Sequence, residues 1–227
     1  MTNTPLSRRT CLAIGGGLLL ATTAGCTDRI PFLGDGPMEF ESSLASVPQS
    51  VLDDTGYEKQ QEEAIEINET FEAAGQSQEV VVTNWQAEYD KSLSLGPVDI
   101  DEDARAAVFT ALTTPQVSVL GRSFNPVADM SSEELAEMVQ DRFDDMGGFS
   151  HVADESATVA GESTTVGEFE GEADVADIGY RIDITLHIAE AVESGDDHIV
   201  GIGGYPTQLR SEERDNIFTL LESIEHS

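Results

Sequence analysis

The sequence predicts an α+β fold, a largely antiparallel sheet flanked by helices, formed by a single domain that spans residues 38–227. Two patterns carry this prediction. Residues 178–188 place a large apolar side chain at every even position, which is typical of a strand with one buried face. Residues 132–143 begin at a capping box formed by Ser131 and Glu134, and their apolar side chains recur at helical spacing.

The N-terminal half of this domain is expected to be mainly strands. Residues 38–47 stop at Pro48 and suggest an edge strand, and a short helical turn follows at 51–55. Residues 62–72 and 80–90 both alternate, and the small and polar residues between them predict a long antiparallel hairpin. Residues 106–113 fit a helix or a strand, and the β-rich residues that follow Pro115 favour the strand.

The C-terminal half is expected to add strands at 151–160, 164–173, 178–192 and 199–205. Ser211 should cap a final helix whose apolar stripe consists of Ile217, Leu220, Leu221 and Ile224. On the strand 178–188 the even residues should face the core. The odd residues, His187 among them, should lie on a polar surface.

The first 25 residues have the layout of an export signal. Arg8 and Arg9 precede an uncharged run from Leu12 to Ala24, and Cys26 follows small residues. The run is shorter than the roughly 20 residues that a membrane-spanning helix needs. The stretch resembles a twin-arginine signal with a lipobox, which implies cleavage before Cys26, lipidation of that cysteine, and a linker over residues 26–37. We therefore expect a lipid-anchored protein on the extracellular face of the cell membrane.

The charge of the chain restricts its partners and its solvent. The formal net charge is −33, from 44 acidic and 11 basic residues. Such a surface repels itself in dilute buffer, and molar salt screens the repulsion. Acid-rich, lysine-poor chains resemble proteins of halophilic archaea. Nucleic acid is excluded as a partner, because no basic patch is available to displace counterions from phosphates.

Few residues point to chemistry. Asn68-Glu69-Thr70 is a candidate glycosylation site in an exported chain. Asp196, Asp197 and His198 are weak candidate metal ligands, because a polar hairpin turn already explains all three. The sequence has no G-x-S-x-G elbow and no zincin motif, so we assign neither catalytic residues nor a cofactor.

From residue 130 to the end, the order of a capped helix, antiparallel strands and a terminal helix resembles the PsbP/Mog1/LpqN-like fold. Residues 115–117 and 124–127, Pro-Gln-Val and Phe-Asn-Pro-Val, give the whole chain a resemblance to a family of haloarchaeal lipoproteins. These resemblances imply a non-catalytic binding or assembly module for a protein or small-molecule ligand. A surface hydrolase with a carboxylate and histidine site, or a structural envelope component, remains an alternative.

Overall fold

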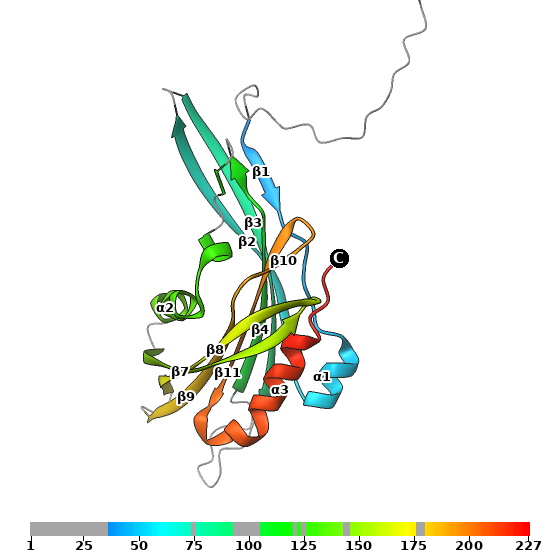
Figure 1. Ribbon diagram of the computed structural model, residues 1–227, viewed down its shortest axis with the longest axis vertical. Coiled ribbons are helices and arrows are strands. Elements are labelled where there is room, and N and C mark those ends of the chain that lie inside the picture. The colour runs from blue at the N-terminus through cyan, green and yellow to red at the C-terminus, as the bar shows by residue number, and fades with distance from the viewer. Residues whose placement is uncertain are drawn as a thin grey trace, which may run out of the picture. The chain divides into compact units, whose positions relative to one another are not determined.

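The computed structural model describes residues 36–73, 76–92, 105–119, 122–123, 126–142, 146–175 and 180–227. A mixed nine-stranded sheet dominates them (Figure 1). Its strands are β1 (Met38–Glu41), β2 (Glu58–Ala73), β3 (Gln76–Ser92), β4 (Arg105–Pro115), β7 (Met146–Val159), β8 (Glu162–Val175), β9 (Tyr180–Ala189), β10 (Val192–Ser194) and β11 (Asp197–Pro206). Two short strands, β5 (Ser118–Val119) and β6 (Arg122–Ser123), form a separate pair.

The main path through the sheet runs β3-β4-β11-β9-β8-β7. Strand β2 pairs along one edge of β3, whereas β1 and then β4 pair along the other. The pairing of β1 with β3 is parallel, and the remaining pairings in this sheet are antiparallel. Among the described residues, β2 and β7 are therefore the outer strands.

The helices are α1 (Gln49–Thr55), α2 (Ser132–Arg142) and α3 (Arg210–Glu222), with 3-10 turns η1 (Pro126–Asp129) and η2 (Thr207–Leu209). The predicted capping box of α2 is confirmed, since Ser131 and Glu134 exchange backbone-to-side-chain hydrogen bonds of 2.9 and 3.3 Å. The predicted cap of α3 is wrong. The helix follows directly on η2, so it begins at Arg210, and no side chain caps its first turn.

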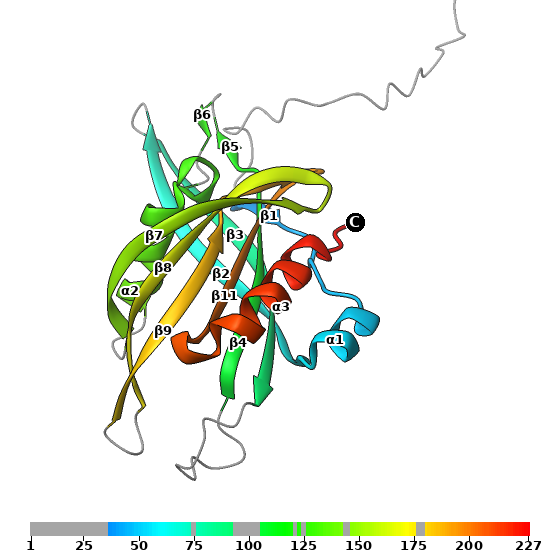
Figure 2. The same ribbon diagram turned by 60° about the horizontal axis from the view of Figure 1, so that its bottom comes forward.

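The predicted fold class is wrong. The structure is a sheet-dominated fold and not a helix-flanked α+β fold, because strands of 14 to 17 residues occupy much of the chain. The sheet also curves: α3 contacts β4 and β11 from the middle of the sheet and β7 from its edge (Figure 2). Helix α3 can lie close to β11 because this strand carries glycines. A Cβ at Gly203 would lie 2.5 Å from the side chain of Ile217 on α3.

Two hydrophobic clusters lie on opposite faces of the sheet. On the α3 side, Ile217, Leu220 and Leu221 are fully buried, which confirms the predicted stripe. On the α2 side, Leu135 belongs to one cluster with three even residues of β9, which are Ile184, Leu186 and Ile188. These even residues are the predicted core face. The C-terminal part of the odd face is covered as well, by α3, so Thr185 and His187 are buried, whereas Arg181 and Asp183 nearer the start of β9 are exposed.

The β2–β3 hairpin confirms the predicted pairing and is longer than predicted. Its register places Ile65 opposite Asn84 and Ile67 opposite Val82, so these side chains share one face of the hairpin. Asn68 lies opposite Val81 on the other face. In Figure 1 the tip of the hairpin lies away from α1 and α3.

Candidate functional site

The residues predicted for export and anchoring, Arg8, Arg9 and Cys26, lie outside the described residues. In the part of the chain that the structure describes, no helix is both long enough and apolar enough to cross a membrane. The predicted glycosylation residue Asn68 lies on β2 and is exposed. Its side-chain amide donates a hydrogen bond of 2.9 Å to the neighbouring Glu66.

The three candidate metal ligands do not form a site together. Asp196 is exposed in the turn between β10 and β11, and Asp197 and His198 are buried at successive positions of β11. Successive strand residues point to opposite faces, which separates these two side chains. Within the described ranges, no group of three or more His, Cys, Asp or Glu side chains could hold a metal ion.

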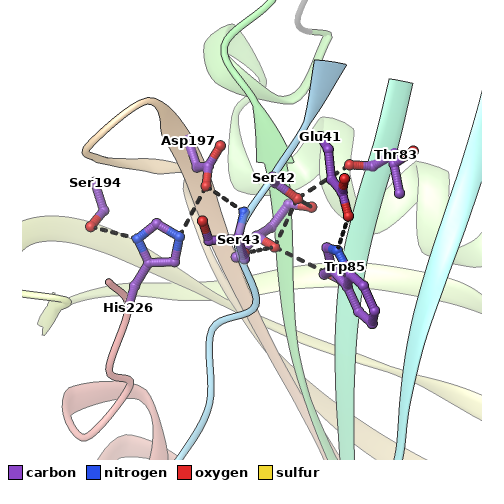
Figure 3. A network of polar contacts seen from close by, with 9 residues as sticks. Glu41, Ser42, Ser43, Thr83, Trp85, Ser194, Asp197 and His226 are labelled. Carbon is purple, nitrogen blue, oxygen red and sulfur yellow. Dashed lines mark hydrogen bonds and ion pairs between the residues drawn. The ribbon is translucent and has the colours of Figure 1, made fainter. Parts of the chain in front are cut away.

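Asp197 instead belongs to a network of polar contacts that joins three distant segments (Figure 3). One carboxylate oxygen, Oδ2, accepts the backbone N–H of Ser43 at 2.7 Å and lies 3.1 Å from Nε2 of His226. The other ring nitrogen of His226, Nδ1, lies 3.0 Å from Oγ of Ser194. The carboxylate therefore connects the segment after β1, the β10–β11 turn and the C-terminal tail. We call Ser43, Ser194, Asp197 and His226 the tail network.

Neighbouring contacts extend the tail network into the sheet. Thr113 Oγ1 on β4 donates a hydrogen bond of 2.7 Å to the carbonyl of Ser43, and Ser42 donates one of 3.1 Å to the carbonyl of Thr113. Backbone bonds of 2.8 and 2.9 Å between Ser46 and Glu225 pair the tail with the same segment. The tail is thus bound on both sides by main-chain and side-chain groups.

Ser194, His226 and Asp197 have the residue types of an acyl-transfer triad. The imidazole accepts or donates at both nitrogens, and the carboxylate fixes the orientation of the ring. However, the side chains of His226 and Asp197 are only 4% and 6% exposed. A general base must come within hydrogen-bonding distance of the proton that it removes from the reacting group. With the ring enclosed in this way, the geometry fits a structural tie better than a reaction centre.

No sequence pattern pointed to Ser194 or His226 as site residues. They lie 32 residues apart, and Asp197 and His226 lie 29 apart, so no local motif links them. Their meeting depends on the tail reaching the β10–β11 turn, which follows from the packing of α3 and from the backbone pairing of Glu225 with Ser46. The neighbouring acid Asp197 was identified, but for a metal site that the structure does not form.

A second polar cluster lies beneath α3. Glu213 is 1% exposed and accepts hydrogen bonds from Tyr57 at 3.1 Å, Lys91 at 2.8 Å and Asn216 at 3.2 Å. Burial and the Glu213 carboxylate raise the pKa of Tyr57. Because the acid is paired with a cation and a phenol, its burial is compensated. This cluster ties α3 to β3 and to the segment after α1.

His187 lies in the same region, and the prediction that it is a surface residue is wrong. It is fully buried, and its Nε2 lies 2.8 Å from the hydroxyl of Tyr205 while its ring contacts the edge of Phe218. Burial, together with the nearby Arg214 and Arg210, lowers the pKa of His187 to about 4. The ring is therefore neutral at pH 7. Within the described residues its Nδ1 has no hydrogen-bond partner.

The arginines of α3 complete the cluster. Arg210 forms ion pairs with the buried Glu168 and, at 3.0 Å, with Glu170 on β8, and Arg214 pairs with Glu155 on β7. These pairs connect the first turns of α3 to the edge of the sheet. The buried carboxylates Glu168 and Glu213 are thus held by internal cations.

The comparisons with known proteins bear on the family of the chain and not on its chemistry. A search of curated proteins found no match to the chain. Residues 44–225 match a family described as a domain of unknown function, DUF6517. The match begins after β1 and ends within the C-terminal tail, so it includes both helices α1 and α3 and the sheet between them. The chain therefore belongs to the DUF6517 family.

Proposed function

We propose that this protein is a lipid-anchored binding or assembly module on the extracellular face of the membrane of a halophilic archaeon, and that it does not catalyse a reaction. The export-signal layout around Arg8, Arg9 and Cys26 supports the address, and the net charge of −33 supports the saline solvent. The buried side chains of Asp197, His226 and Glu213 pair internally, which supports a structural use for them.

The candidate binding surface is one face of the β2–β3 hairpin together with the adjoining strand β1. It presents Met38 and Phe40 of β1, Ile65 and Ile67 of β2, and Val82 of β3, which share one face through the strand register. Ile67 is 42% exposed, and the other four are partly buried. We call these five residues the hairpin face. A surface on which five apolar side chains adjoin and stay at least partly open to solvent is a candidate contact site for another molecule.

The test is a photo-cross-linking residue placed at Ile67 in the full chain, irradiated in its own membranes at molar salt. The matched control carries the same residue at Val152 on β7, which is 44% exposed on the opposite outer strand. A discrete adduct from position 67 and none from position 152 supports a binding module. Equal labelling from both positions, or none from either, contradicts it.

The anchor is tested separately by Cys26→Ser. The variant should lose the mass of a lipid and leave the membrane fraction. A variant that still partitions with membranes would refute anchoring through Cys26, whatever the outcome of the cross-linking.

The alternative of a surface hydrolase has one observation in its favour, the Ser194, His226 and Asp197 contacts. Its test is labelling by a fluorophosphonate ester, which acylating serines attack. A hydrolase requires labelling that Ser194→Ala abolishes. An unlabelled wild-type chain supports the tail network as a structural tie.

A further inference from the structure

Among the described residues strand β2 is an outer edge of the sheet, and it carries the sole glycosylation sequence of the chain. Asn68-Glu69-Thr70 is the only Asn-x-Ser/Thr triplet among the 227 residues. Within the described residues β2 pairs with β3 alone, so its outer backbone groups face no other strand. Asn68 and Thr70 are both exposed. An unpaired edge of this length is a template for pairing with another chain.

Charge is the usual protection of such an edge, and β2 carries Glu62, Glu63, Glu66 and Glu69 in its central part. These side chains are exposed, so their repulsion acts through solvent. At molar salt the Debye length falls to about 3 Å, which is shorter than the roughly 4.8 Å between paired strands. The charges that protect the edge in dilute buffer therefore lose most of their effect in the proposed solvent.

We propose that Asn68 is N-glycosylated and that the glycan blocks the β2 edge from pairing with a second copy of the chain. In the transfer step the side-chain nitrogen, Nδ2, bonds to the anomeric carbon of a lipid-phosphate-linked oligosaccharide. The bond from that carbon to the phosphate oxygen breaks, the lipid phosphate leaves, and the amide loses one proton to a base of the transferase. A bulky glycan excludes a second strand sterically, and salt does not weaken steric exclusion as it weakens electrostatic repulsion.

The position of Asn68 suits a folded acceptor. Twin-arginine export carries a folded domain, so the acceptor must be accessible in the folded state. Among the described residues the side-chain amide bonds to Glu66 alone, and this exposed contact costs little to break. Asn68 lies opposite Val81 and on the other face from Ile67 and Val82, so a glycan there leaves the hairpin face open.

The first experiment measures the mass of the peptide that contains Asn68 in protein isolated from its own membranes. The inference rests on the proposed extracellular location, and the mass of the Cys26 peptide from the same sample reports that location. Thr70→Ser keeps the acceptor sequence, whereas Thr70→Val removes it with a side chain of similar shape that favours strands. We expect a hexose-bearing mass in the wild type and Thr70→Ser, and the bare mass in Thr70→Val and Asn68→Gln.

An unmodified Asn68 on a chain with lipidated Cys26 overturns this inference alone. An unmodified Asn68 on a chain that keeps its first 25 residues overturns the inference and the proposed location together.

The second experiment tests the block on pairing. The wild type and Thr70→Val, each purified with detergent at molar salt, are compared by light scattering across a hundredfold range of concentration. Circular dichroism checks that both are folded. We expect Thr70→Val to associate with rising concentration and the glycosylated chain to remain monomeric, with association of Thr70→Val reduced at lower salt that still keeps it folded. Masses that correspond to a monomer for both chains and do not change with concentration would overturn the blocking role.

Discussion

His187 gives the sharpest test of the structure, because its burial predicts how stability depends on pH. Burial and the two arginines of α3 lower its pKa to about 4, while an unfolded chain has a histidine pKa of about 6.5. Between these values the unfolded chain binds a proton that the folded chain does not bind. Stability is therefore complete above pH 6.5 and falls as the pH drops toward 4, by about 3 kcal/mol from pH 7 to pH 4.

The measurement compares the wild type with His187→Leu by equilibrium unfolding at fixed molar salt, at several pH values from 7.5 to 4. The acidic residues titrate in both proteins, so the difference between the two curves isolates His187. Loss of the contact with Tyr205 adds an offset of about 1 to 3 kcal/mol. That offset does not vary with pH, because burial raises the pKa of Tyr205 and keeps its hydroxyl neutral throughout.

We expect the wild type to lose about 3 kcal/mol more than His187→Leu across this range. Parallel curves would refute the reasoning, because they would mean that His187 binds a proton as readily in the folded chain as in the unfolded chain. In that case α3 does not cover the odd face of β9.

Three further predictions follow from the same contacts. Lys91→Met should destabilise the fold by about 3 to 5 kcal/mol in a denaturant titration, because it leaves Glu213 buried without its cation. The control is Lys59→Met, which removes the exposed pair with Glu62 and should cost at most about 1 kcal/mol in the same titration. Ile184→Ala should cost about 2 to 5 kcal/mol by equilibrium unfolding, since the side chain is buried between β9 and α2, and a loss below 1 kcal/mol would contradict that packing. Dialysis from molar to millimolar salt should unfold the chain cooperatively and reversibly by circular dichroism, and an unchanged spectrum would argue against a fold that depends on screening of the net charge of −33.

The apolar periodicities predicted the elements well where a single face decides the pattern. Ile184, Leu186 and Ile188 on β9, and Ile217 and Leu221 on α3, lie in the core as their spacing indicates. The capping box of α2 is equally local, since both of its bonds join residues three positions apart. Such signals can be read from sequence because the interacting residues are near neighbours along the chain.

The odd face of β9 could not be predicted in this way. Alternation distinguishes apolar from polar residues, and it does not distinguish a polar residue in water from a polar residue paired inside the protein. Thr185 and His187 are buried because Thr207 and Tyr205 bond to them from segments about 20 residues away. The parallel pairing of β1 has the same origin, since its register with β3 leaves no local pattern. The fold class was wrong because the local patterns showed neither the full length of the strands nor the distant segments with which they pair.

The buried polar contacts also take the place of covalent cross-links. The two cysteines of the chain are Cys11 and Cys26, so residues 36–227 contain no disulfide. The tail network fixes the C-terminus. The contacts of Arg210 and Glu213 fix the first turn of α3 to the sheet. Salt screens buried pairs much less than exposed ones. Molar salt should therefore relieve the repulsion between surface carboxylates and leave these internal ties in force, so that the same solvent that weakens every exposed ion pair still favours the folded chain.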